Sequence, residues 1–346
     1  MSDRPISRPR PTLLQVAKLA GVSLKTASRV LNDEPYVSVG TAAKVRTAAD
    51  QLGFRLNGIA RELRAGARSS AVGLIISDVA NPFYARITRG AERQLRAMGL
   101  QLITASSDED PAVERQLTAE MLERRVSGLL LTTCVDDHGY LEAERRLGIP
   151  VAFLDRPPSG IVADTVALDN EVGARHAAEH LIAHGHRRIG LVGDLSRLST
   201  HRERIAGFEA AMAAAGIADW QRYVRVDSHD SEAAERAVRD LLSMELPPTA
   251  LFTTNNRITV GALRAMQQLA EPPALVGFDD FDLADLLGVT VIAHSPEQLG
   301  EIGAALVLSR LDGGHGAAHQ QRLPTTLIAR GSGERPPPIA LAGHRM

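Results

Sequence analysis

Residues 12–32 combine two short helical patterns with a glycine between them, and this segment constrains the fold of the chain more than any other stretch. The first pattern has apolar residues at i, i+3, i+4 and i+7, which form one face of a helix: Leu13, Val16, Ala17 and Ala20. Thr12 and Gln15 form a capping box at its start. Gly21 permits a tight turn, and Ser23 can cap a second helix.

The second helix of this segment has one apolar and one polar face. Ala27, Val30 and Leu31 fall on the apolar face. The opposite face carries polar and basic side chains, namely Lys25, Ser28, Arg29 and Asn32. Two short helices joined by a glycine turn, the second with a basic outer face, predict a helix-turn-helix whose second helix enters the major groove of DNA. The alternative is an ordinary helical hairpin whose charges are only solvated.

Charge is distributed unevenly along the 346 residues, whose formal net charge is -2. Residues 1–70 hold 12 Lys and Arg against 5 Asp and Glu, whereas the remainder holds 27 against 36. A basic N-terminal segment attached to an acidic body indicates that only the first part meets a polyanion. Aromatic residues make up 3% of the chain, which argues against single-strand binding through base stacking.

The compartment is also indicated by the sequence. The single cysteine, Cys134, excludes an intramolecular disulfide and fits a reducing environment. The first ten residues lack the apolar region of a signal peptide. No apolar stretch approaches the ~20 residues of a membrane span. We therefore expect a cytoplasmic protein without a membrane partner.

Strand-like runs alternate with helical patterns from about residue 70 onward. The runs lie at 72–76, 100–105, 128–133, 151–154, 189–192, 250–253 and 274–276. Helical patterns include those at 83–98, 113–125, 172–183, 203–215 and 231–242. This alternation predicts an α/β fold with parallel sheets covered by helices on both faces. A break near residues 157–164 indicates two similar lobes, with a ligand cleft where the C-terminal ends of their strands meet.

Several motifs occur in the order found in one protein family. The N-terminal part contains VSLKTASRVLN at 22–32 and NGIAREL at 57–63. The α/β part contains DVANPFY at 78–84, HGHRRI at 184–189, RIAGF at 204–208, NNRITVGA at 255–262 and VGFDD at 276–280. Together they resemble the lactose/galactose-repressor (LacI/GalR) family from about residue 12 to about residue 331. The resemblance implies a dimeric transcription regulator, more often a repressor than an activator, with a periplasmic-binding-protein-like effector domain.

The resemblance also implies a division of the chain. Residues 12–56 would form the helix-turn-helix DNA-binding domain, and residues 57–69 a hinge helix or linker. Residues 70–333 would form the effector-binding and dimerisation domain. Its two lobes would lie at roughly 70–164 and 165–295, with crossover returns at 296–333.

Residues that would contact DNA follow from the same resemblance. Leu24 and Lys25 begin the recognition helix, where Lys25 can donate to guanine and Leu24 can contact a thymine methyl group. Arg29 occupies the position of a recurrent arginine of the family, and Ser28 shares its face of the helix. The positions that match phosphate contacts are Thr12, Ser23, Thr26, Asn32 and Ser38. The first two and the last of these are also expected to cap helices.

In the family, the segment that follows is a hinge helix lying in the minor groove. Asn57 can cap this helix, and Leu63 matches the apolar wedge between base pairs. The alternative is a simple linker with Leu63 packed on the effector domain. The sequence departs from the family here, because Leu56 replaces the usual proline and Gly58 costs about 1 kcal/mol of helix stability relative to alanine. We therefore expect a segment that is disordered without DNA.

A second set of residues matches effector-binding positions in the cleft. They are Asp78, Phe83, Tyr84, Asp155, Arg204, His229, Asn255 and Asp279. Carboxylates, an amide and a guanidinium can bind vicinal hydroxyls, and an aromatic ring can cover the apolar face of a sugar. The expected effector is therefore a sugar or sugar derivative, with a nucleobase or other small anion as the alternative. Asp155 and Asp279 could instead cap strand ends, and His229 falls where some relatives have a stacking aromatic.

Metal and enzyme functions are the remaining alternatives. His176, His180 and His184 have the spacing of a helical metal ladder, with His186 close by, but no carboxylate or cysteine completes a site. We expect neither a metal nor another cofactor. Nucleotide-binding and nucleophile motifs are lacking, so we expect no catalytic residue and no enzyme. The alternative function is that of a sugar-binding or sugar-processing protein of the same two-lobed fold, which would not retain duplex DNA.

Overall fold

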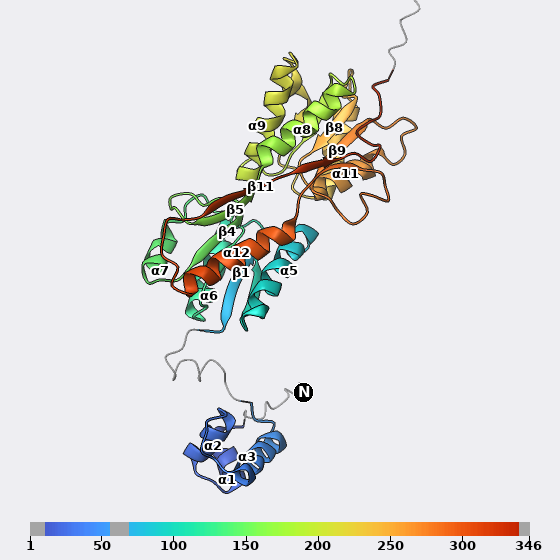
Figure 1. Cartoon of the computed structure of the whole chain (residues 1–346). Coiled ribbons are helices and arrows are strands. Elements are labelled where there is room, and N and C mark those ends of the chain that lie inside the picture. Colours follow the sequence, from blue (N-terminus) through green and yellow to red (C-terminus); the bar gives the residue numbers. More distant parts are fainter. Residues whose placement is uncertain (1–10, 56–68, 339–346) are drawn as a thin grey trace, which may run out of the picture. The chain divides into compact units, whose positions relative to one another are not determined.

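The structure is a computed structural model that describes residues 11–55 and 69–338. The chain divides into two compact units, one up to Ser69 and the other from Ser70 onward. Figure 1 shows the elements of each unit. Among the described residues, none of the helices has both the length and the apolar character that crossing a membrane requires.

The N-terminal unit is a bundle of three short helices. These are α1 (Leu13–Ala20), α2 (Leu24–Leu31) and α3 (Val39–Leu52). Small and branched apolar side chains from all three helices form its core: Val16, Ala17, Ala27, Val30, Val45, Ala48 and Ala49. The predicted helix-turn-helix is therefore present, with α3 packed against both of its helices.

Side chains fix the start of each helix in this unit. Thr12, Ser23 and Ser38 each accept a hydrogen bond from the backbone N–H three residues later, and Thr12 and Gln15 form the predicted capping box. Gly21 ends α1 with φ at 68°, a left-handed conformation that costs glycine little. The turn between α1 and α2 is therefore defined by Gly21 at the end of α1 and by the Ser23 cap at the start of α2.

The first lobe of the second unit contains a six-stranded parallel sheet in the order β11-β5-β4-β3-β1-β2. Its strands are β1 (Ala71–Ile76), β2 (Gln101–Ser106), β3 (Leu129–Leu131), β4 (Val151–Asp155), β5 (Asp164–Leu168) and β11 (Gln320–Leu323). Its helices are α5 (Pro82–Ala97), α6 (Pro111–Glu123), α7 (Glu142–Arg146) and α12 (Pro296–Leu311). In Figure 1, α5 and α12 run side by side against the sheet.

The second lobe repeats this plan with the order β12-β10-β9-β8-β6-β7, in which only β12 is antiparallel to its neighbour. Its strands are β6 (Ile189–Val192), β7 (Val224–Arg225), β8 (Ala250–Thr253), β9 (Ala274–Phe278), β10 (Thr290–Ala293) and β12 (Thr326–Ile328). Its helices are α8 (Asn170–Ala183), α9 (Ser199–Ala214), α10 (Ser231–Leu242) and α11 (Asn256–Met266). The paired helices are α8 with α9 and α10 with α11.

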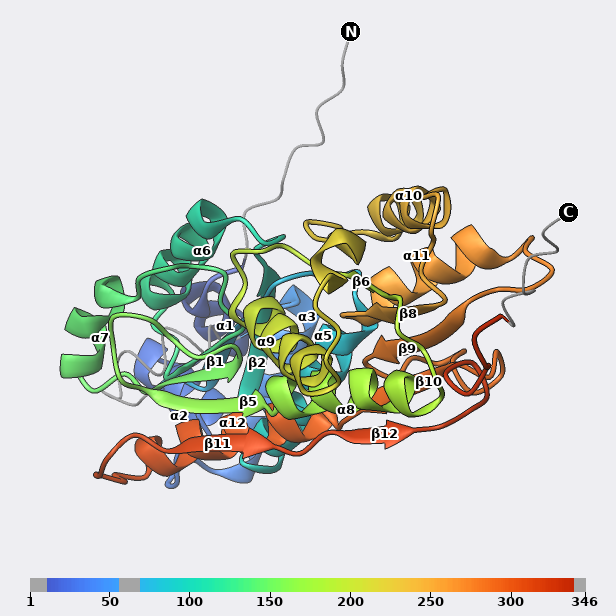
Figure 2. The same cartoon turned by 90° about the horizontal axis from the view of Figure 1, so that it is seen from above.

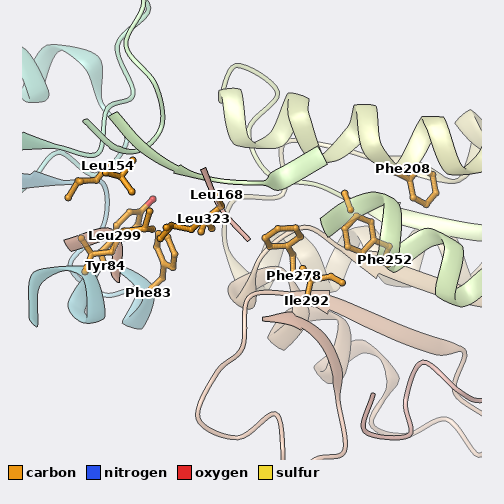
Figure 3. Close-up of a cluster of buried hydrophobic side chains, with 14 of the residues drawn as sticks. Phe83, Tyr84, Leu154, Leu168, Phe208, Phe252, Phe278, Ile292, Leu299 and Leu323 are labelled. Carbon is orange, nitrogen blue, oxygen red and sulfur yellow. The ribbon is translucent and has the colours of Figure 1, made fainter. Parts of the chain in front are cut away.

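Within residues 69–338, the chain passes between the two sheets after β5, after β10 and after β11. Figure 2 shows β11 and β12 end to end along one edge of the unit. Apolar side chains lie where the chain leaves the first sheet. Leu168 ends β5 and Leu323 ends β11, and Figure 3 shows both between the cores of the two lobes. The buried cluster is thus continuous across the lobes.

Every strand predicted from the sequence is present, but several elements were missed. Residue 164, where we divided the lobes, begins β5, and β5 pairs with β4 in the first sheet. The first passage between the sheets therefore follows Leu168. The strand β11 was missed because three of its four residues, in the sequence QQRL, are polar, and two of these are exposed at the sheet edge. Helix α12 lies in the stretch 296–333 that the resemblance gave as crossover returns, and it packs in the first lobe, which is therefore discontinuous in sequence.

Candidate functional site

The C-terminal ends of strands from both lobes face one shared cavity, which is lined by residues of both lobes. Asp155 ends β4 with φ at 67°, and Asp279 follows β9 with φ at 71°. This left-handed conformation is uncommon for residues with a side chain, and it ends each strand abruptly. The two lobes thus contribute one buried aspartate each at equivalent positions of their sheets.

All eight residues that we assigned to the effector site from the sequence line this cavity. They are Asp78, Phe83, Tyr84, Asp155, Arg204, His229, Asn255 and Asp279. The lining also includes residues that we had missed: Asn81, Glu109, Arg156, Asp194, Thr200 and Arg257. Glu109, Arg156 and Asp194 each come within three residues of the end of a strand, as Asp78 does. Their position after a strand could therefore have identified them as cavity residues from the sequence.

Arg156 is the most constrained of the missed residues. It is 4% exposed, and its two terminal nitrogens donate to the Glu109 carboxylate at 3.0 and 2.7 Å. One of these nitrogens also donates to the Tyr84 hydroxyl at 3.0 Å. Burial raises the pKa of Tyr84, so this hydroxyl stays protonated and can donate in turn. Arg156, Glu109 and Tyr84 therefore form a buried hydrogen-bonded group on the first-lobe side of the cavity.

Arg204 is the corresponding buried and hydrogen-bonded arginine of the second lobe. Its Nε donates to Asn170 Oδ1 at 2.9 Å, and Nη1 donates to the carbonyl oxygen of Thr254. Its guanidinium carbon lies 3.8 Å from the centre of the Phe278 ring, a cation–π arrangement. Nη2 lies 3.9 Å from Asp279 Oδ1. The guanidinium is therefore held in place before any ligand arrives.

The pKa values of the two strand-end aspartates are shifted in opposite directions. Burial would raise the pKa of Asp279, but Arg204 and a 2.8 Å hydrogen bond from His294 Nε2 hold it below its ordinary value. Burial instead raises the pKa of Asp155, whose Oδ1 has no hydrogen-bond partner in the described part of the chain. Asp279 is thus a fixed anion, whereas Asp155 presents a buried carboxyl oxygen that has no hydrogen-bond partner among the described residues.

A third polar group lies on the second lobe. Asp194 accepts hydrogen bonds from His229 Nδ1 at 2.8 Å and from Asn255 Nδ2 at 2.9 Å. The hydrogen bond to Asp194 raises the pKa of His229. His229, a weak candidate in the sequence, is therefore paired with a carboxylate that we had not selected.

The lobes also contact each other directly across the cavity. Arg257 at the start of α11 forms an ion pair with Asp78 of the first lobe. Its neighbour Asn256 donates from Nδ2 to Asn81 Oδ1 at 2.9 Å. These contacts join the two lobes directly beside the cavity.

Aromatic surface is available beside the polar groups. The Phe83 ring packs edge-on against Tyr84, with centroids 5.0 Å apart, and against His294 at 5.6 Å. Figure 3 shows Phe83 and Tyr84 together at the edge of the first lobe. Fixed carboxylates, guanidinium groups, an amide and an aromatic ring from two lobes can bind a small polyhydroxylated molecule.

In the N-terminal unit, the predicted DNA-contacting residues fall into two groups. Leu24, Lys25 and Arg29 are exposed on α2, with Leu24 49% exposed and Arg29 Nε 3.7 Å from Glu34 Oε2. Ser28 is partly exposed beside them. The second group makes capping contacts at helix ends: Thr12, Ser23, Thr26, Asn32 and Ser38. Asn57 and Leu63 lie outside the described residues.

Two of the histidines considered for metal binding, His180 and His186, have partners near the C-terminal end of the described residues. His180 Nε2 lies 2.5 Å from Glu334 Oε1, and His186 Nε2 lies 2.8 Å from the carbonyl oxygen of Arg335. They attach the segment after β12 to the second lobe. Within residues 11–55 and 69–338, no group of three or more metal-ligating side chains is placed to hold an ion.

Two family models match the chain. The model for bacterial regulatory proteins of the lacI family matches residues 12–57. The model for periplasmic binding proteins and the sugar binding domain of the LacI family matches residues 69–276. This chain belongs to the LacI family.

Individual LacI-family relatives match along most of the chain. The ribose operon repressor of Escherichia coli (strain K12) is 30% identical over 93% of this chain and 99% of its own length. The HTH-type transcriptional regulator PtxS of Pseudomonas aeruginosa is 32% identical over 94% and 96%. The structure of the transcriptional regulator CelR in complex with cellobiose has 29% identity and a TM-score of 0.69, covering 93% of this chain and all of its own.

The protein is accordingly a LacI-family transcriptional regulator. It has an N-terminal DNA-binding domain and a periplasmic-binding-protein-like ligand-binding domain, as the resemblance implied. The relatives that match it are transcriptional repressors and regulators.

Proposed function

We propose that this LacI-family regulator represses transcription by binding a pseudo-palindromic operator as a dimer, and that a sugar or sugar derivative in the cavity changes its affinity for DNA. The observation that carries the ligand half is the convergence of Asp155 and Asp279 from the two lobes on one cavity. A ligand that touches both lobes binds their closed arrangement more tightly than an open one. Its binding energy can then shift the conformation of the protein.

In the DNA half of the proposal, the exposed residues of α2 read base edges. Arg29 and Lys25 donate to guanine, and Leu24 contacts a thymine methyl group. The hydroxyls of Thr12, Ser23, Thr26 and Ser38, with Ser28 and Asn32, set the position of the helix against phosphates. Residues 57–69 form the hinge, where Leu63 enters the minor groove. A protein that binds chromosomal DNA works where the chromosome is, so the proposal includes a cytoplasmic location.

In the ligand half, each polar group has a chemical role. Asp155 Oδ1 accepts from a ligand hydroxyl, because it has no partner among the described residues. Arg204 and Asn255 donate to ligand oxygens, and Phe83 covers an apolar ring face. Relatives support this class of ligand, since one regulates a ribose operon and the structure of another holds cellobiose.

A thermal-shift screen of the full chain tests the ligand. A ligand at about a hundredfold excess over its Kd stabilises the folded protein by about 2.7 kcal/mol. Monosaccharides including ribose, disaccharides including cellobiose, sugar phosphates and purines form the panel. A sugar should raise Tm, and Asp279→Ala should abolish the shift while the variant still melts cooperatively and still binds DNA. A purine hit, or a sugar hit that shifts Asp279→Ala as much as the unmodified protein, would refute the assignment.

A further inference from the structure

The effector cavity holds more carboxyl groups than guanidinium groups. Among its described lining residues, the carboxyl groups belong to Asp78, Glu109, Asp155, Asp194 and Asp279. The guanidinium groups belong to Arg156, Arg204 and Arg257, and the imidazole belongs to His229. Hydrogen bonding alone would admit either a sugar or its phosphate ester, whereas the balance of charge distinguishes the two.

The charge of Arg156 is matched within the protein. Its terminal nitrogens donate to both oxygens of the Glu109 carboxylate, and its Nε lies 3.7 Å from Asp155 Oδ2. The same terminal nitrogens also donate to the Tyr84 hydroxyl, the Ser77 hydroxyl and the carbonyl oxygen of Thr133. Arg156 and Glu109 are both buried, so a phosphate group could reach this guanidinium only by displacing a buried carboxylate.

The other two guanidinium groups also face carboxylates. Arg257 forms the ion pair with Asp78 that joins the lobes. Arg204 Nη2 lies 3.9 Å from Asp279 Oδ1, and the pKa of Asp279 is held below its ordinary value, so this carboxylate keeps its charge. Within the described lining, each guanidinium therefore has a carboxylate as its neighbour.

Two carboxyl groups of the lining remain beyond these pairs. Asp194 accepts hydrogen bonds from His229 and Asn255, and it stays an anion because the hydrogen bond from His229 lowers its pKa against the effect of burial. Asp155 is 3% exposed, and its Oδ1 has no hydrogen-bond partner among the described residues. Such an oxygen favours a ligand that donates a hydrogen bond, and carboxyl groups repel an anion.

We propose that the effector cavity selects an uncharged sugar and rejects its phosphorylated form, and that Glu109 and Asp78 determine this charge selectivity. The proposal rests on the proposed function, because it specifies the ligand of the same cavity. An arginine guanidinium matches the geometry of phosphate, and Glu109 and Asp78 occupy the two arginines that could otherwise bind it. A sugar hydroxyl can donate to Asp155 and accept from Arg204, whereas a phosphate dianion can only accept.

Matched ligands that differ by one phosphate ester test the selectivity. Titration calorimetry of the full chain compares ribose with ribose 5-phosphate and glucose with glucose 6-phosphate, at ionic strength held constant with chloride. Where the sugar of a pair binds, it should bind at least about tenfold more tightly than its phosphate ester. Equal or tighter binding of the phosphate ester would overturn the proposal.

Inorganic phosphate tests the role of Asp78 independently of any sugar. Asp78→Asn releases Arg257, which is 31% exposed and lines the cavity, so this variant should bind phosphate saturably and the unmodified chain should not. Glu301→Gln on α12 is the matched control, because it releases Arg93 outside the cavity. Phosphate binding that is equal in the unmodified chain, the control and Asp78→Asn would overturn the proposal.

Glu109→Gln is the second variant, and it releases Arg156 on the first-lobe side. Because this pair is buried, cooperative melting is checked first, and the Asp78→Asn result does not depend on it. A cooperatively melting Glu109→Gln variant should also gain phosphate binding. Cooperative melting without that gain would overturn the role of Glu109.

Failure of this proposal is distinguishable from failure of the proposed function. If no sugar of the thermal-shift panel binds, the sugar assignment fails, while the phosphate titrations still decide the role of Asp78. If a sugar and its phosphate ester bind equally well, the charge selectivity fails and the sugar assignment stands.

Discussion

Arg257 at the start of α11 and Asp78 after β1 form an ion pair that joins the two lobes across the effector cavity. Asp78 was expected to bind the effector, but in this arrangement its carboxylate already has a protein partner. The pair therefore links the lobes directly in this structure.

Removing this pair should weaken closure. Arg257→Gln is expected to lower the affinity for the sugar by about fivefold, because a partly exposed ion pair contributes about 1 kcal/mol. Titration calorimetry with the sugar identified by thermal shift measures the change. Arg264→Gln on the same helix is the control, since Arg264 donates to the Ser231 hydroxyl within its own lobe and, among the described residues, forms no ion pair with the other lobe. Equal affinity in Arg257→Gln and the control would show that the pair does not favour closure.

Arg29 should read a base rather than a phosphate. Arg29→Ala is expected to weaken specific operator binding by about 1–3 kcal/mol and to relax the preference at one base pair of each half-site. The reason is its exposed position on the outer face of α2, where its guanidinium Nε lies 3.7 Å from Glu34 Oε2. Binding to selected and random duplexes distinguishes the roles. Equal losses on both would make Arg29 a phosphate contact.

The His229–Asp194 hydrogen bond should make stability depend on pH. Because the bond raises the pKa of His229 above its unfolded value of about 6.5, its contribution is complete below that value and is lost as pH rises through the folded pKa. His229→Gln should therefore lower Tm more at about pH 5.5 than at about pH 8.5. A decrease in Tm that is equal at both pH values would contradict this coupling.

Close packing of α5 against α12 depends on small residues. A Cβ atom at Gly300 would overlap the carbonyl oxygen of Ile87, a backbone atom that cannot move aside alone. Gly300→Ala should therefore destabilise the ligand-binding domain by about 1–3 kcal/mol. Gly316→Ala, where a Cβ would meet no atom within 4 Å, is the control. Denaturant unfolding that gives equal midpoints for the two variants would contradict the packing argument.

Local patterns in the sequence predicted much of the fold. The caps and apolar periodicity of α1 and α2, and the buried strands such as β4, are visible in short windows of sequence. The discontinuous first lobe was not visible in such windows, and only the family resemblance implied the returns at 296–333. Its edge strand β11 pairs with β5, although more than 150 residues separate them and β11 itself is polar. Such pairing depends on tertiary contacts rather than on local propensity.

The cavity was predictable to a similar extent. Asp155 and Asp279 follow strands, and parallel strands bring their C-terminal ends together, so their convergence could be expected. The pairing of Arg156 with Glu109, 47 residues earlier in the chain, could not be expected from spacing. Neither residue belongs to a motif that we had recognised, and their shared burial becomes apparent only in the folded lobe.

Fluorescence anisotropy of a labelled operator duplex, titrated with the full chain in the presence and absence of the sugar found by thermal shift, tests ligand-responsive DNA binding most directly. We expect the sugar to change operator affinity by about tenfold, a coupling of about 1.4 kcal/mol, and the Asp279→Ala variant to bind the operator without responding to the sugar. Identical operator affinity with and without a sugar that demonstrably occupies the cavity would contradict the proposed function.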